Sequence, residues 1–256
     1  MEIISLINQK GGVGKSTTAH ALGAGLCQKG YRVLFMDLDP QGNLSYALNL
    51  DTINIQNMYS LLMDNSKNIS MTQAIQETTC GMAIASSLKL SGADNLLTDT
   101  GKEYRLKECI AEAHCETNFD YIILDTPPSL GILTINALTA ATKIIIPTQA
   151  DIFSLQGIGQ LYNTISIVKR YTNPGLTIEG ILLIRYSARS ILARDISELI
   201  EETARKLETK VFDSRIRESV AVKEAQAKRQ DIFTYAPNSN PCIDFTEFIN
   251  EFLGGK

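Results

Sequence analysis

A short segment near the N-terminus combines glycines, lysines and hydroxyl residues at a spacing that suits phosphate binding. Residues 8–17 read NQKGGVGKST, and Gln9 stands where the usual phosphate-binding loop has its first glycine. Glycines let backbone N–H groups turn inward around an anion, and a helix that starts at the loop adds its positive dipole end. The residues expected to form a nucleotide-binding loop are Lys10, Gly11, Gly12, Val13, Gly14, Lys15, Ser16 and Thr17.

Each polar side chain of this loop has its own expected role. Lys15 meets the β and γ phosphates, the Ser16 hydroxyl is a ligand of Mg²⁺, and Thr17 lies near the α phosphate. Lys10 is a second cation in front of the same anion. It either folds back on its own phosphates or reaches across a subunit boundary to those of a partner. A glycine-rich turn without a ligand would leave the adjoining lysine and serine unexplained.

A first pair of carboxylates follows a short buried strand. Residues 37–43 read DLDPQGN, and side chains two apart on a strand point to the same side. The proline and glycine of this motif force a turn, so a turn-forming aspartate is one interpretation of Asp39. The chemical interpretation is a carboxylate near Mg²⁺ and the γ phosphate that orients the attacking water.

A second acidic motif lies farther along the chain. Residues 121–131 read YIILDTPPSLG, a hydrophobic strand that ends in Asp125 and is followed by a loop stiffened by two prolines. A carboxylate at such a strand end holds Mg²⁺ directly or through a water, and the backbone N–H of Gly131 is expected to reach the γ phosphate. ATP and Mg²⁺ are therefore the expected ligands. The expected ligands of Mg²⁺ are Ser16, Asp39 and Asp125, and the expected catalytic residues are Lys10, Lys15, Asp39 and Asp125.

The elements around these motifs alternate between strand and helix. Apolar runs typical of strands covered on both faces lie at 2–7, 32–37, 120–125, 143–148 and 178–184, with a weaker run at 82–85. Helical spacing occurs at 15–29, 101–114, 131–141, 154–170, 190–207 and 243–253. This alternation predicts a doubly wound, mostly parallel α/β sheet with helices on both faces, in a single domain over 1–256. Residues 49–79 are expected to form a surface excursion with a short helix at 56–63, and the chain after 228 to be loop-like.

Together the motifs resemble those of the ParA/MinD superfamily of ATPases. KGGVGKST resembles the deviant phosphate loop (deviant Walker A motif) of that superfamily, DLDPQGN its switch I and DTPPSLG its switch II. The missing first glycine is normal there. The resemblance implies a P-loop NTPase fold and a nucleotide-sandwich homodimer in which Lys10 reaches the partner's nucleotide. We also expect slow hydrolysis, because no arginine beside the loop looks like an arginine finger.

The resemblance is to the ParA/Soj branch in particular. PTQADIFSLQGIGQL at 147–161 resembles a ParA segment in which Asp151 takes the place of the usual Glu, and SAR at 187–189 resembles the D-A-R that follows. The similarity is looser after 185. It implies an ATP-dependent DNA-segregation ATPase: the ATP dimer binds DNA non-specifically, and a ParB-like centromere-binding partner stimulates hydrolysis. The cytoplasm is the expected location, on the nucleoid when ATP is bound.

The distribution of charge favours DNA as a partner. The chain has a formal net charge of −4, whereas residues 185–229 hold 11 basic and 8 acidic residues. Non-specific DNA binding depends on phosphate contacts by such basic side chains. Arg189 is the first expected DNA contact. The others are Arg194, Arg215, Arg217, Lys223, Lys228 and Arg229, and a solvated surface of mixed charge is the alternative for each.

Three other functions each fit part of the sequence. A MinD-like membrane switch would end in a basic amphipathic helix, but the last helix carries Asp244, Glu247 and Glu251, so we expect it to pack on the domain. A reductase similar to nitrogenase iron protein needs cysteines beside switch II, and the five cysteines form no such motif. Against a nucleotide-binding adaptor that does not hydrolyse ATP stand Lys10, Lys15 and Asp39 together. No signal peptide or membrane-spanning helix is expected.

Overall fold

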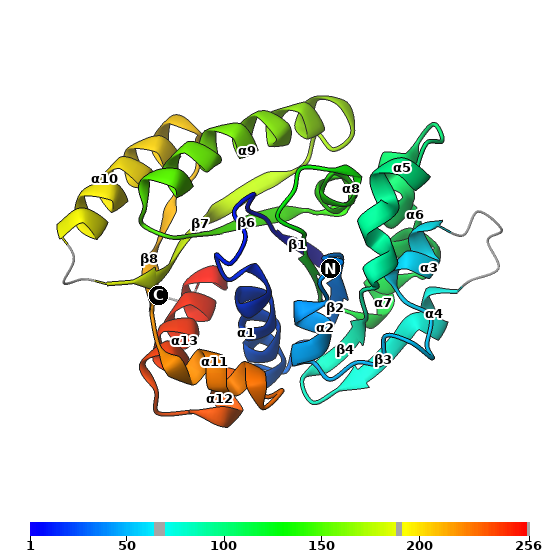
Figure 1. The fold of residues 1–256 in the computed structure, drawn as a ribbon, viewed down its shortest axis with the longest axis horizontal. Helices are drawn as coiled ribbons and strands as arrows, with labels where there is room; N and C mark the ends of the chain where they lie inside the picture. The colour runs from blue at the N-terminus through cyan, green and yellow to red at the C-terminus, as the bar shows by residue number, and fades with distance from the viewer. Residues whose placement is uncertain (64–69, 188–190, 255–256) are drawn as a thin grey trace.

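Eight strands form one sheet at the centre of the part of the chain that the computed structural model describes, residues 1–63, 70–187 and 191–254 (Figure 1). Their order is β3-β4-β2-β5-β1-β6-β7-β8, and neighbours run parallel except β3 and β4, which pair antiparallel. The strands are β1 (Glu2–Leu6), β2 (Val33–Asp37), β3 (Ile75–Thr78), β4 (Gly81–Ile84), β5 (Tyr121–Asp125), β6 (Lys143–Thr148), β7 (Thr177–Tyr186) and β8 (Val211–Arg217).

Helices cover both faces of this sheet (Figure 1). On one face lie α1 (Lys15–Gln28), α2 (Asn43–Ala47), α11 (Val220–Ala227), α12 (Ile232–Tyr235) and α13 (Asn240–Phe252). On the other lie α3 (Met58–Met63), α4 (Met71–Ala74), α5 (Ala93–Leu96), α6 (Arg105–Glu112), α7 (Cys115–Asn118), α8 (Ile132–Ala140), α9 (Ile152–Tyr171) and α10 (Ile191–Lys206). Two short 3-10 helices, η1 (Leu88–Gly92) and η2 (Lys102–Tyr104), precede α5 and α6.

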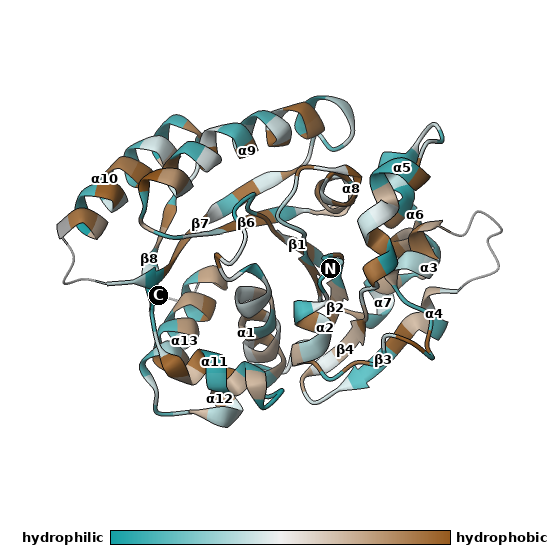
Figure 2. Ribbon diagram, viewed as in Figure 1, coloured by the Kyte–Doolittle hydropathy of each residue, from teal (hydrophilic) through white to brown (hydrophobic). Residues whose placement is uncertain are grey.

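The sheet separates two apolar cores. Successive side chains of a strand point to opposite faces, so Ile3 enters the core under α8 and α9 while Ile4 enters the core under α1 and α13. Apolar residues follow one another along β6 and β7, whereas α9 and α10 carry hydrophilic and apolar residues in alternation (Figure 2). Strands buried on both sides are the reason for the continuous apolar runs in the sequence. The predicted doubly wound α/β fold is confirmed.

Two strands were not predicted from the sequence, and both lie at an edge of the sheet. β8 reads VFDSRIR and β3 reads IQET, so each carries polar side chains where the central strands carry aliphatic ones. An edge strand has one paired side and more solvent, and it tolerates these residues. The chain after 228 is also less loop-like than expected, because Asp231 caps α12 by accepting the backbone N–H groups of Phe233 and Thr234.

The C-terminal helix packs on the sheet, as the sequence predicted. Phe245, Phe248 and Ile249 of α13 are buried. The acidic residues of the helix also have partners in the chain: Asp244 accepts hydrogen bonds from Arg217, and Glu251 accepts from two backbone N–H groups of β8. No helix within the described ranges is long and apolar enough to cross a membrane.

Candidate nucleotide-binding site

The residues singled out in the sequence meet at the carboxyl ends of three adjacent strands. β1 leads into the phosphate loop, β2 ends in Asp37 and β5 ends in Asp125. β5 lies between the other two, and its Asp125 is paired in register with Leu6 of β1 and Asp37 of β2. The carboxyl edge of an open α/β sheet, where the strand order reverses, is the place where such folds bind ligands.

The phosphate loop has the backbone conformation that its glycines allow. Gly12 and Gly14 have φ angles of 72° and 85°, in the left-handed region that other residues avoid. A Cβ atom on Gly14 would also lie 2.6 Å from the side chain of Ile184. Gly14 is the N-cap of α1 and provides no side-chain cap, so the first N–H groups of this helix are not claimed by such a cap and suit an anion.

Lys15 is a buried cation held at the centre of the loop. Its side chain is 6% exposed, and its Nζ donates to the backbone carbonyl of Asn8 at 3.1 Å. Burial lowers the pKa of Lys15, and the charges of Asp125 and Asp39 oppose that shift. A charge so poorly solvated gains most from an anion that enters the site.

Asp125 is the least satisfied polar group of the site. It is fully buried, and neither carboxylate oxygen has a hydrogen-bond partner among the described residues. Burial raises its pKa well above the usual range, as does the charge of Asp37, while the Ser16 hydroxyl and Lys15 act in the opposite direction. A buried carboxylate beside a hydroxyl fits a hard divalent cation, which prefers oxygen ligands.

Ser16 and Asp125 fit a cation that takes its remaining ligands from a bound substrate. No group of three or more His, Cys, Asp or Glu side chains in the described ranges forms a complete metal cage. Mg²⁺ usually keeps waters and takes one or two protein oxygens together with phosphate oxygens. Ser16 and Asp125 would supply the protein oxygens, and Asp39 as a third ligand stays a prediction.

Asp37 and two serines fix the position of Asp39. Asp37 accepts from the backbone N–H of Asp39 at 3.1 Å and from the hydroxyl of Ser45 at 2.6 Å. The backbone N–H of Ser86 donates to the Ser45 hydroxyl at 2.8 Å, and the Ser86 hydroxyl donates to the Asp39 carbonyl at 2.6 Å. Burial raises the pKa of Asp37 to about 7, although the hydrogen bonds from Ser45 act to lower it.

The sequence reasoning missed both of these serines. Ser86 follows the weak apolar run at 82–85, so a polar residue just beyond a buried strand was the available signal. Ser45 had no such signal, since it lies on the short helix α2 and is seen only once that helix packs against β2.

The switch II segment has a partner that was not predicted either. Asp94 of α5 accepts from the backbone N–H of Ile132 at 2.7 Å, at the start of α8. A Cβ atom on Gly131 would lie 2.5 Å from the same carboxylate, so a larger residue there would displace Asp94. The γ-phosphate contact expected of Gly131 stays a prediction, and Asp94 is the group beside it in the single chain.

A cavity of about 470 Å³ opens in front of these groups, within the size range of small-molecule sites. Its walls include the phosphate loop, Asp39, Pro128 of switch II and Arg185. A smaller hollow adjoins it, and Arg185 and Thr17 line both. The sequence analysis found no arginine beside the loop, whereas the fold brings Arg185 there from the end of β7. Its φ of 50° at an irregularity of the strand is a conformation that functional residues often adopt.

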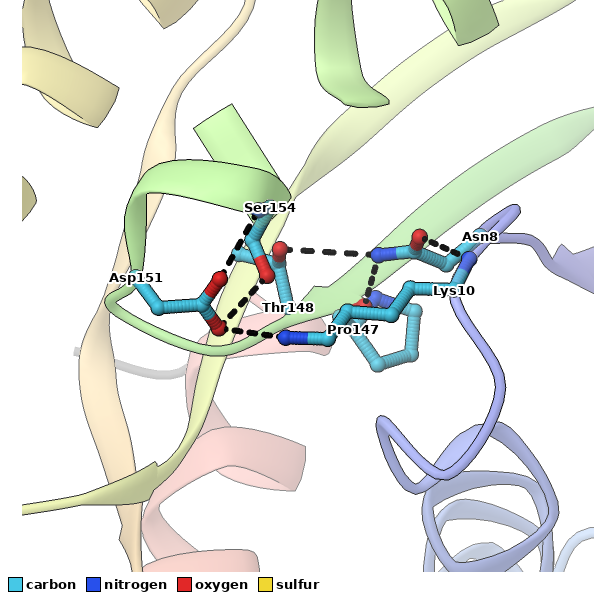
Figure 3. A network of polar contacts seen from close by, with 6 residues as sticks. All are labelled: Asn8, Lys10, Pro147, Thr148, Asp151 and Ser154. Carbon is cyan, nitrogen blue, oxygen red and sulfur yellow. Dashed lines mark hydrogen bonds and ion pairs between the residues drawn. The ribbon is translucent and has the colours of Figure 1, made fainter. Parts of the chain in front are cut away.

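Lys10 does not fold back on the loop. Its Nζ donates to Asp151 Oδ2 at 2.7 Å, at the start of α9 (Figure 3). Partial burial acts to raise the pKa of Asp151, but the hydrogen bonds from Lys10 and Ser154 outweigh it and lower that pKa. In the single chain, Lys10 is therefore engaged by Asp151.

The expected DNA contacts do not gather into one patch. Arg189 lies outside the described residues. Arg194 is exposed on α10 and Lys223 on α11, and these helices cover opposite faces of the sheet. Arg215 donates to Tyr186 and Glu201, and Arg217 is paired with Asp244. Of the remaining two residues, Lys228 is exposed, and Arg229 is also exposed but stacks over the ring of Tyr46.

The five cysteines lie in or against the two apolar cores. All five are free, and Cys80, Cys115 and Cys242 are buried. Burial raises the pKa of Cys80 to about 12 and that of Cys109 to about 11, so they stay protonated. None of the five lines the cavity in front of the phosphate loop.

Several known proteins resemble this chain over most of its length. A family model described as an AAA domain matches residues 1–178. The sporulation initiation inhibitor protein Soj of Bacillus subtilis (strain 168) is 39% identical over 98% of this chain and 97% of its own length. The chromosome partitioning protein ParA of Myxococcus xanthus (strain DK1622) is 34% identical over 98% of this chain and 87% of its own length. This chain belongs to the ParA/Soj family of partitioning ATPases.

A solved structure of similar sequence supports the fold of this ParA/Soj chain. Cobyrinic acid a,c-diamide synthase from Mycobacterium smegmatis, with bound ADP and magnesium, has a TM-score of 0.83 and 33% sequence identity. The match covers 99% of this chain and 94% of that chain. The reaction in the name of that enzyme does not transfer with the fold, because folds host many functions.

Proposed function

We propose that this chain is a DNA-partitioning ATPase: ATP and Mg²⁺ assemble a homodimer, the dimer binds DNA without sequence preference, and hydrolysis stimulated by a ParB-like partner releases it. The observation that carries the nucleotide part is the buried Asp125, whose two oxygens lack hydrogen bonds beside Ser16. When bound, Mg²⁺ neutralises charge on the β and γ phosphates. Lys15 and the N–H groups at the start of α1 bind the phosphates from the other side.

Asp39 is the residue that we assign to turnover. It lines the cavity, and its Oδ1 accepts from the backbone N–H of Gln41 at 3.0 Å. Phosphoryl transfer needs little covalent help from the protein, so Asp39 would act by orienting the attacking water. Hydrogen bonds from the Ser86 hydroxyl to the Asp39 carbonyl and from the Asp39 N–H to Asp37 fix the backbone of Asp39.

Arg185 is assigned to the nucleotide but not to the transferred phosphate. It lines both hollows together with Thr17, on the side of the loop where the α phosphate is expected. A guanidinium there would bind ATP and ADP alike. Turnover would therefore still lack an arginine at the γ phosphate, which fits a slow enzyme that waits for its partner.

The basic residues proposed to bind DNA come from both faces of the sheet. Arg194 and Lys223 are exposed on opposite faces of the sheet, so one protomer presents them in different directions. A dimer doubles each group of charges, and the contacts to DNA phosphates then add up without any reading of bases. The names of the relatives, chromosome partitioning proteins, favour the same function.

A MinD-like membrane-associated ATPase has less support. The apolar face of α13 is buried in the chain, and Asp244 and Glu251 are bonded to β8. A helix so engaged presents neither the apolar face nor the basic residues that an anionic membrane surface needs.

The proposal is tested by charge reversal in two regions. Arg189→Glu should leave the ATP-dependent dimer intact in sedimentation and weaken its binding to duplex DNA several-fold. Lys223→Glu tests α11 in the same way. Arg170→Glu, at the exposed end of α9 and outside residues 185–229, is the matched control and should bind DNA like the unmodified chain. If Arg189→Glu and Lys223→Glu both bind DNA as tightly as the unmodified chain, neither region belongs to the interface.

A further inference from the structure

Both lysines of the phosphate loop are engaged inside the single chain. Lys15 donates to the Asn8 carbonyl, and Lys10 donates to Asp151, which is 141 positions away in sequence. The loops that carry Lys10 and Asp151 follow β1 and β6, which are neighbours in the sheet. Lys10 thus spans the gap between two strand ends, as Figure 3 shows.

Asp151 is held in place by α9, independently of Lys10. It is the N-cap of this helix of 20 residues and accepts from the backbone N–H of Ser154 at 3.0 Å. The Ser154 hydroxyl donates to Asp151 Oδ2 at 2.9 Å, so the oxygen that receives Lys10 is fixed by a buried group. The carboxylate is therefore a preformed acceptor.

The backbone on the lysine side is fixed as well. Asn8 Oδ1 accepts from the backbone N–H of Lys10 at 2.9 Å, and Asn8 Nδ2 donates to the carbonyl of Pro147 at 2.8 Å. One asparagine thus ties the start of the phosphate loop to the end of β6 (Figure 3). With both backbones fixed, only the flexible side chain of Lys10 needs to move for the ion pair to open.

We infer that Asp151 is a competing partner for Lys10, and that each protomer must break the Lys10–Asp151 ion pair before Lys10 reaches the nucleotide of the partner. This inference rests on the dimer of the proposed function. The pair acts as an intrachain latch. It keeps Lys10 bound to Asp151 in the single chain and so raises the protein concentration that dimer assembly needs. A triphosphate on the partner has more negative oxygens than one carboxylate and replaces it.

The exposure of the pair suits a latch that opens. The side chains of Lys10 and Asp151 are 37% and 31% exposed, so water and salt screen their attraction. Such a pair changes an equilibrium by up to about fivefold. A symmetric dimer opens two of them, and the effect on the dimer dissociation constant therefore reaches about 25-fold.

Substitutions at Asp151 separate the charge from the helix cap. Asp151→Asn removes the ion pair and keeps the cap, because asparagine caps helices as well as aspartate does. Asp151→Glu keeps the charge. Ser154→Ala removes one hydrogen bond behind the carboxylate and leaves the ion pair, so it is the matched control for local disturbance. The dimer dissociation constant of each variant is measured by sedimentation velocity with AMPPNP and Mg²⁺, at low and at moderate salt.

The latch predicts a tighter dimer when the charge is removed. Asp151→Asn should dimerise at a protein concentration several-fold to about 25-fold lower than the unmodified chain does. The difference between the two dimer dissociation constants should be smaller at higher salt. Asp151→Glu and Ser154→Ala should stay near the unmodified value. An unchanged or weaker dimer of Asp151→Asn would overturn the latch.

A Lys10→Ala variant distinguishes a failure of the proposed function from a failure of the latch. If Lys10→Ala dimerises normally, the dimer role of Lys10 in the proposed function is wrong. If Lys10→Ala loses the dimer while Asp151→Asn equals the unmodified chain, the proposed function stands and only the latch fails.

Discussion

Truncation of Phe248 tests whether the last helix belongs to the core or to a membrane. Its ring is fully buried under β8 and meets Phe212 edge to face, with centroids 5.0 Å apart. Replacing a buried phenylalanine by alanine costs about 3–5 kcal/mol through lost burial and the cavity that remains. In a chain of this length, each kcal/mol lowers the midpoint of thermal unfolding by about 2–4 °C. Phe248→Ala should therefore lower that midpoint by about 6–20 °C.

The assay is thermal unfolding followed by circular dichroism, beside cosedimentation with anionic vesicles. Ile243→Ala is the matched control, because Ile243 lies on the same helix with 46% of its surface exposed. It should change stability by less than about 0.5 kcal/mol. A Phe248→Ala protein that unfolds within about 2 °C of the unmodified chain and loses vesicle binding would refute the packing argument and favour the MinD-like alternative.

Four further predictions concern the site. Lys15→Ala should lose ATP binding in calorimetry, and retained micromolar affinity would contradict the loop assignment. Asp39→Ala should keep ATP and the dimer but lose phosphate release, whereas normal turnover would remove it from the mechanism. Arg185→Met should weaken ATP and ADP by similar factors in the same titration and leave kcat unchanged, and a loss of kcat alone would move it to the γ phosphate. Because the pKa of Asp37 is raised to about 7, the stability that Asp37 contributes is present below about pH 4 and is lost as pH rises to about 7. Asp37→Asn should therefore reduce the change with pH, across that window, in the free energy of unfolding of the nucleotide-free chain, measured in denaturant titrations. The same change with pH in both proteins would contradict burial as the cause of the raised pKa.

The sequence predicted the centre of the molecule well because burial leaves a simple pattern there. β1, β2, β5 and β6 are apolar on both faces, and their polar ends mark the ligand edge. The edge strands β3 and β8 carry charges and hydroxyls that read as loop. Their pairing depends on neighbours that are far away in sequence.

Some residues of the site could likewise be predicted from the sequence, and others could not. The phosphate loop, Asp39 and Asp125 are local motifs, so the residues could be named before any fold was known. Asp94, Arg185 and Asp151 reach the site from other strand ends or helices, and nothing within a few residues of each one signals its partner. Such contacts depend on how the crossovers arrange the strands in the sheet. The sequence pattern predicts the order of the elements along the chain but not that arrangement.

The measurement that tests the central claim most directly is the binding of the unmodified chain to a random-sequence duplex, without nucleotide, with ADP·Mg²⁺ and with ATP·Mg²⁺, at several salt concentrations. A nucleotide-gated partitioning ATPase predicts binding only with ATP, with an affinity that falls steeply as salt rises. Equal binding in all three states, or none with ATP bound, would contradict it.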